Sequence, residues 1–309
     1  MRVVDRLAIS SRSGAGLNGM TDTVAVQTLT VGEGDDLITY DVRGDLTAAT
    51  ADRPALFILG SPMEASYFAP LAEHFADRPV VTYDPRGTAR NPHGTSPLTP
   101  EQHAEDLHRV VEAVGGGPVD VFASSGGAVN SLALVAAHRE DVRRVVAHEP
   151  PTAALLPDRE NVLAVVDEMR ATYDTEGNGP AMAKFIALVM LDGEVPGDYL
   201  DRPAPDPAMF GMSAEDDGAR DNALMRNLGP CNRYQPDLDA LAALGDRLVI
   251  AAGEDSGQQL AARGAYTVAA RLGSEVAIFP KGHGGFLPGD GDPDGFAARL
   301  HEVLDRPSD

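Results

Sequence analysis

Cysteine is nearly absent from this chain, and this scarcity indicates in which kind of cellular compartment the protein works. The 309 residues include a single cysteine, Cys231, so no disulfide can form within the chain. This usage is typical of proteins in a reducing compartment, and we therefore expect a cytoplasmic protein. A chain of this length buries roughly 75% of the surface that its unfolded form exposes, so it needs no covalent cross-link.

Basic residues are also scarce. The chain has 25 Lys and Arg against 47 Asp and Glu, which gives a formal net charge of −22, and lysine occurs only at positions 184 and 281. Binding to a nucleic-acid backbone or to an anionic membrane surface needs clustered positive charge. We therefore expect a small-molecule partner and neither a nucleic-acid nor a membrane partner, while the sequence leaves the oligomeric state open.

Long hydrophobic runs and cofactor motifs are missing as well. No stretch approaches the roughly 18 apolar residues that span a bilayer. The sequence contains no metal-ligand cluster and no dinucleotide-binding fingerprint, so we predict no cofactor and no metal site. Residues 1–19 are polar and rich in serine and glycine, and we predict that they form a flexible N-terminal extension.

After this extension, short apolar runs alternate with helical patterns. ALFILG at 55–60 is typical of a buried strand, and Thr99, Pro100 and Gln102 form a capping box that begins a helix over 99–117. Further strands are expected at 24–31, 37–44, 79–84, 118–123, 142–149, 247–253 and 275–280. The alternation predicts an α/β protein with a mostly parallel sheet, whose ligands bind beyond the carboxyl ends of the strands.

Residues 152–230 interrupt the alternation with helices and proline-rich loops. We predict that they form an inserted helical cap, while residues 20–151 and 231–309 form the core. Six of the nine methionines fall in this segment, at positions 169, 182, 190, 209, 212 and 225. Methionine suits adaptable apolar surfaces, so these residues either roof a pocket for a hydrophobic substrate or pack the helices together.

The segment VDVFASSGGAVNSLA, residues 119–133, places a Ser-Ser-Gly-Gly corner between a predicted strand and a predicted helix. A tight strand-to-helix turn exposes a nucleophile only if the residues two before and two after it are small. Ser125 meets this condition through Ala123 and Gly127, whereas Ser124 follows Phe122 by two positions. The sequence therefore favours Ser125 as a nucleophile, with the N–H of Gly126 available to an oxyanion.

Three further motifs accompany this corner in the order LGSPMEASYF (59–68), YDPRG (83–87) and KGHGGF (281–286). With them, the chain from about residue 24 to 305 resembles the α/β-hydrolase fold superfamily, and in particular its serine esterases and lactonases with an inserted helical cap. The resemblance implies a sheet of about eight strands. One departure is Leu59, which stands where the family often has histidine.

The resemblance also implies roles for residues of these motifs. His283, in the late glycine-rich loop, is expected to be the catalytic base. Ser61 and Gly126 are expected to supply the two N–H groups of the oxyanion hole, since Pro62 has none. The residues expected to bind substrate are Gly60, Met63, Ser124 and Phe286.

Two carboxylates compete for the role of the acid that orients the histidine. The common family pattern, Gly-x-x-Asp, places Ser256 at the acid position of Gly253-Glu254-Asp255-Ser256, so Asp255 is displaced by one residue. Glu149 instead ends the strand after the nucleophile helix, a second acid location in this fold, and a buried carboxylate there needs a partner. We predict Glu149 and retain Asp255 as the alternative.

These expectations describe a cofactor-free serine hydrolase that cleaves a carboxylic ester or lactone of a small, apolar molecule through an acyl-enzyme. Two alternatives share the fold. One is a non-hydrolytic enzyme, similar to hydroxynitrile lyases or acyl transferases, and the other is a ligand-binding receptor with little turnover.

Overall fold

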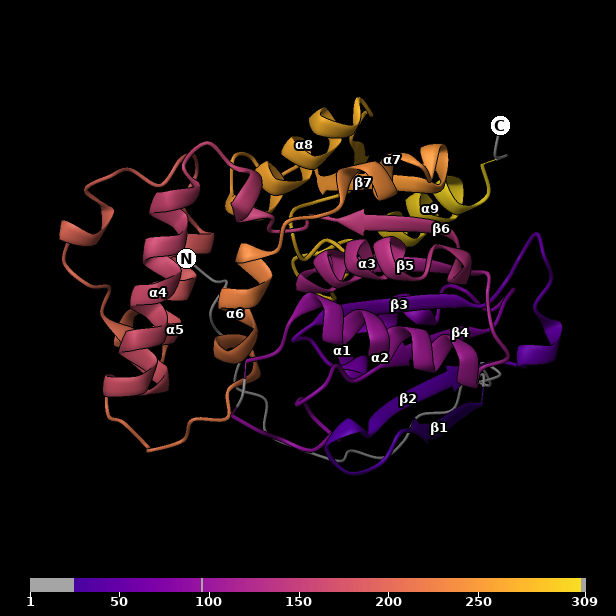
Figure 1. The fold of residues 1–309 in the computed structure, drawn as a ribbon, viewed down its shortest axis with the longest axis horizontal. Helices are drawn as coiled ribbons and strands as arrows, with labels where there is room; N and C mark the ends of the chain where they lie inside the picture. Colours follow the sequence, from indigo (N-terminus) through magenta and orange to yellow (C-terminus); the bar gives the residue numbers. More distant parts are fainter. Residues whose placement is uncertain (1–24, 96, 307–309) are drawn as a thin grey trace.

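The predicted apolar runs form one sheet in the computed structural model of the protein, which describes residues 25–306 except residue 96 (Figure 1). The predicted extension, residues 1–19, lies outside the described residues. In the described part of the chain the sheet has eight strands in the order β1-β2-β4-β3-β5-β6-β7-β8. The strands are β1 Val26–Val31, β2 Ile38–Arg43, β3 Leu56–Ser61, β4 Val80–Tyr83, β5 Val119–Ser125, β6 Val142–His148, β7 Leu248–Gly253 and β8 Ala277–Phe279.

The sheet is mostly parallel, as predicted. Strand β2 pairs antiparallel with both β1 and β4, and all other neighbouring strands are parallel. The carboxyl ends of β3, β5, β6 and β7 therefore lie along one edge of the sheet. Most residues of the active site predicted from the sequence lie at or just after the ends of these strands.

Helices cover both faces of the sheet. The apolar residues of one face pack with α1 (Ala65–Ala72) and α9 (Pro293–Leu304). Those of the other face pack with α2 (Pro100–Ala113), α3 (Gly126–Ala137), α7 (Leu238–Ala242) and α8 (Leu260–Leu272). The predicted capping box begins α2, because the Thr99 hydroxyl accepts from the N–H of Gln102 and the Gln102 side chain accepts from the N–H of Thr99.

The segment predicted as a cap contains α4 (Arg159–Glu176), α5 (Asn178–Val189) and α6 (Ala223–Arg233). These helices lie together at one end of the molecule, on the side to which the β6 arrow points (Figure 1). The predicted boundary at residue 230 falls inside α6, because this helix continues through Pro230 to Arg233. Among the described residues, no helix has the length and apolarity that a bilayer span requires.

A histidine is buried in the aromatic core between the sheet and α9. His148, the last residue of β6, is fully buried, and its Nδ1 lies 3.2 Å from the Oγ of Ser124 on the neighbouring strand β5. Four phenylalanine rings surround it, those of Phe122, Phe279, Phe286 and Phe296. Burial lowers the pKa of His148 to about 4, so the ring is neutral at pH 7.

This burial makes the stability of the fold depend on pH. The pKa of His148 falls from an ordinary 6.5 to about 4 on folding. Below pH 6.5 the unfolded chain binds a proton at His148 that the folded chain does not bind. The free energy of unfolding therefore falls by about 3 kcal/mol in total as the pH drops from 6.5 to 4. His148→Gln cannot ionise, so the free energy of unfolding of the wild type should fall more steeply than that of the variant between pH 6.5 and 4. Urea denaturation at several pH values measures both slopes, and equal slopes would contradict the prediction.

Candidate active site

Ser125 occupies the turn between β5 and α3 in a strained backbone conformation. Its φ is 58° and its ψ is −128°, a region that residues with a side chain seldom adopt. Its side chain makes no capping hydrogen bond to α3, and the residue is half-buried. The turn therefore leaves the hydroxyl of Ser125 at the carboxyl edge of the sheet, without a role in the helix that follows.

The two glycines after Ser125 are required by the close approach of β3. A Cβ on Gly126 would lie 2.5 Å from the carbonyl oxygen of Ser61, and one on Gly127 would lie 2.6 Å from the Cα of Gly60. Both distances are shorter than any van der Waals contact allows. Ser61 is also the register partner of Ser125 in the parallel pair of β3 and β5. The structure thus brings Ser61, Ser125 and Gly126 together at adjacent strand ends.

His283 and Glu149 form the closest polar contact of the site. The Nδ1 of His283 lies 2.5 Å from the Oε2 of Glu149, although 134 residues separate them in the sequence. The other carboxylate oxygen of Glu149 accepts from the N–H of Gly253 at 2.8 Å. Glu149 itself leaves β6 with a positive φ of 49°, which turns its side chain away from the strand direction.

The electrostatics of Glu149 follow from this contact. The residue is only 1% exposed, and burial alone would raise the pKa of its carboxyl group. The hydrogen bond and charge of His283 outweigh burial and lower the pKa to about 2. Glu149 therefore remains ionised at neutral pH and can stabilise a positive charge on His283.

Asp255, the alternative acid, lies elsewhere. It is exposed, and its backbone N–H donates to the carbonyl of Lys281 at 3.0 Å. In the described part of the chain, no hydrogen bond or ion pair joins its carboxylate to His283, and none joins the Ser125 hydroxyl to the His283 ring. Of the two candidate carboxylates, the one in contact with His283 is that of Glu149.

The residues expected to bind substrate occupy different environments. Gly60 is buried at the end of β3, and Met63 is half-buried beside it. Ser124 and Phe286 are 0% and 1% exposed and belong to the packed layer around His148. The expectation that these two side chains bind substrate is therefore corrected: both lie in the core beneath the site, because they point to the face that α1 and α9 cover.

Two further histidines are buried in the structure. His103 on α2 is 2% exposed, because α6 covers it and the Oδ1 of Asn227 lies 3.3 Å from its Nε2. The ring of His148 is stacked on that of His283 at a centroid distance of 6.1 Å. The period-two alternation of β6 places His148 on the same face as the buried Val146, which explains its burial.

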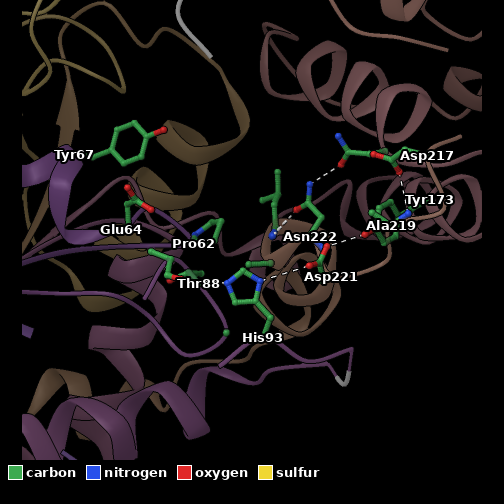
Figure 2. Close-up of a pocket in the computed structure, with 15 residues that line it drawn as sticks. Pro62, Glu64, Tyr67, Thr88, His93, Tyr173, Asp217, Ala219, Asp221 and Asn222 are labelled. Atoms are coloured by element: carbon green, nitrogen blue, oxygen red, sulfur yellow. Dashed lines mark hydrogen bonds and ion pairs between the residues drawn. The ribbon is translucent and has the colours of Figure 1, made fainter. Parts of the chain in front are cut away.

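A cavity of about 480 Å³ lies between loops of the core and the segment predicted as a cap (Figure 2). Ser125, Glu149 and His283 are not among the residues that line it, but Pro62, which follows Ser61, is. Pro62 links it to the oxyanion-loop segment, and Figure 2 shows Glu64 and Tyr67 on one side and Asp221 and Asn222 on the other. Its lining contains no methionine, whereas Met169 and Met225 are buried among the helices of this segment, in agreement with the second of the two alternatives for these residues. Polar groups are prominent in it, namely Glu64, Thr88, His93, Asn178, Asp217, Asp221 and Asn222.

Solved structures support the same architecture. An α/β hydrolase from a Medee basin deep-sea metagenome library aligns with a TM-score of 0.63 at 17% identity, covering 88% of this chain and 95% of that one. The enol-lactonase of Burkholderia xenovorans LB400 aligns with a TM-score of 0.61 at 16% identity, over 87% and 97%. The carboxylesterase CesB of Bacillus subtilis aligns with a TM-score of 0.61 at 16% identity, over 91% and 92%.

Sequence comparison gives the family. The uncharacterized hydrolase YraK of Bacillus subtilis strain 168 is 26% identical over 278 residues, which cover 87% of this chain and 93% of that protein. The model of the alpha/beta hydrolase fold family matches residues 54–287, a span that contains the Ser125 turn, Glu149 and His283. The chain therefore belongs to the α/β-hydrolase fold family.

Proposed function

We propose that the protein is a cofactor-free serine hydrolase that cleaves a carboxylic ester or lactone of a small molecule. The observation that carries the proposal is the contact between Glu149 and His283 at the sheet edge where Ser125 leaves its strand. This arrangement supplies a nucleophile, a base and an ionised group that orients the base.

In the proposed first step, Nε2 of His283 takes the proton of the Ser125 hydroxyl as Oγ attacks the carbonyl carbon. The Nδ1–H of His283 donates to Glu149, whose low pKa keeps it ionised as the imidazolium forms. The N–H groups of Ser61 and Gly126 stabilise the oxyanion. The tetrahedral intermediate collapses, and the alcohol leaves with the proton that His283 carried.

The second step returns the enzyme to its starting state. Water loses a proton to His283 and attacks the acyl carbon, and the carboxylic acid leaves as Ser125 regains its proton. Among the described residues, no hydrogen bond joins Ser125 to His283, which is compatible with this chemistry because catalytic hydrogen bonds often tighten only when substrate binds.

The substrate class follows from the site and from the neighbouring cavity. An enol-lactonase and a carboxylesterase share the fold, which favours an ester or lactone bond. The cavity has room for a small molecule and offers carboxylates, amides and the His93 ring near Pro62. We therefore infer a substrate with at least one polar group remote from the scissile bond, in place of the apolar one expected from the sequence.

Replacing the nucleophile tests this proposal. Ser125→Ala should lower kcat for p-nitrophenyl esters of short acids by at least about 10³-fold, because no hydroxyl remains to form the acyl-enzyme. Ser124→Ala, the matched control one residue earlier, should retain activity within about tenfold, since its hydroxyl contacts His148 in the core. Release of the free acid measures hydrolysis directly. Equal losses in the two variants would contradict the assignment, and acylation without release of acid would favour a transferase.

The choice of acid has its own test. Glu149→Gln should lower kcat by about 10³- to 10⁴-fold, because the amide can neither hold the His283 tautomer nor stabilise the imidazolium. Asp255→Asn should leave kcat within about twofold, since Asp255 is exposed and makes no contact with His283. Circular dichroism of both variants controls for folding. A larger loss in Asp255→Asn than in Glu149→Gln would show that Asp255 is the acid.

A further inference from the structure

Two histidines and three carboxylates meet where α2 passes the carboxyl end of α3. Glu105, His108 and Glu112 lie on one face of α2, at spacings of three and four residues. His138 ends α3, and Asp141 follows three residues later in a short 3₁₀ turn. The local spacings are therefore Glu-x-x-His on one helix and His-x-x-Asp at the end of the other.

The side chains of this cluster are already in contact. The Nδ1 of His108 lies 2.7 Å from Asp141, and the Nε2 of His138 lies 2.8 Å from Glu105. The two imidazole rings stack almost in parallel, with centroids 3.8 Å apart and planes 5° apart. His108, His138 and Asp141 each offer a ligand atom, and these atoms all lie within 4.8 Å of one another.

The charge of the cluster is unbalanced. In the described part of the chain, no arginine or lysine is recorded as a partner of Glu105, Glu112 or Asp141, whose ion pairs are with the two histidines. By contrast, the buried Asp120 pairs with two arginines. Three carboxylates therefore face two imidazole rings in this cluster. The carboxyl end of α3 adds further negative potential.

The backbone holds the Asp141 part of the cluster in place. The N–H of His138 donates to Leu134 at 2.7 Å, and that of Asp141 donates to His138 at 3.0 Å. Gly117 packs against this turn so closely that a Cβ there would lie 2.6 Å from the Asp141 carbonyl oxygen. The Asp141 side chain is 7% exposed, whereas those of His108 and His138 are 23% and 18% exposed and have access to solvent.

We propose that His108, His138 and Asp141 bind a divalent first-row transition metal ion, for which Zn²⁺ is the probe. Imidazole nitrogens with a carboxylate suit zinc, whereas calcium and magnesium take oxygen ligands. The stacked rings pivot to direct one nitrogen each at the ion, and Glu105 or Glu112 completes the coordination. The sequence showed no metal pattern because the ligands come from two helices that only the fold brings together.

The site is separate from the proposed catalytic centre. Helix α3 has 12 residues and is about 18 Å long, with Ser125 at its start and His138 at its end. The bound ion therefore joins α2 to α3 and stabilises the folded chain, and it takes no part in ester cleavage.

Calorimetric titration of the full chain without an affinity tag tests the proposal. One Zn²⁺ per chain should bind at pH 8, and His108→Gln and His138→Gln should each weaken binding at least about tenfold. Glu140→Gln is the matched control, because it removes an exposed carboxylate from the same turn, and it should change the affinity less than twofold. Unchanged affinity in both histidine variants, or an equal loss in Glu140→Gln, would overturn the assignment.

Cobalt titration of the wild-type protein provides a second measurement that does not depend on the folding of a variant. Co²⁺ should give a visible ligand-field spectrum that saturates at one equivalent, and Zn²⁺ should displace it while Mg²⁺ should not. A spectrum that never saturates, or displacement by Mg²⁺, would overturn the proposal.

Discussion

The hydrogen bond between His283 and Glu149 is the interaction on which the rest of the site depends. Glu149 is 1% exposed, and a carboxylate that deep in the protein is unstable unless a partner compensates its charge. His283 provides that partner from a loop 134 residues away, and Gly253 adds an N–H from the neighbouring strand. The contact therefore fixes the ring of His283 at the edge of the sheet where β6 and β7 end.

Strand register explains how Ser125 and Glu149 come to the same edge. Ser124 and His148 are direct partners in the pairing of β5 and β6, and their side chains contact each other within the core. The residue after each of them leaves the sheet with a positive φ, 58° at Ser125 and 49° at Glu149. The buried pair of Ser124 and His148 therefore sets the distance between Ser125 and Glu149, each of which follows one member of the pair.

Much of this could be predicted from the sequence, because it depends on local patterns. The apolar runs gave the strands, and the small residues around Ser125 distinguished it from Ser124, which is fully buried. Contacts between distant segments could not be predicted in this way. The sequence favoured Glu149 but left Asp255 open, because the choice depends on the course of the loop after β7. The burial of His103 depends on its contact with Asn227 of α6. The same is true of the two helices that bring His108 and His138 together.

We propose that Ser125 is a nucleophile activated by the pair of His283 and Glu149. The most direct measurement is the intact mass of the protein after treatment with a fluorophosphonate, followed by fragmentation of the modified peptide to assign the adduct. We expect one adduct per chain, carried by Ser125 and absent from Ser125→Ala. An adduct on Ser124, or no adduct on the wild-type protein, would contradict it.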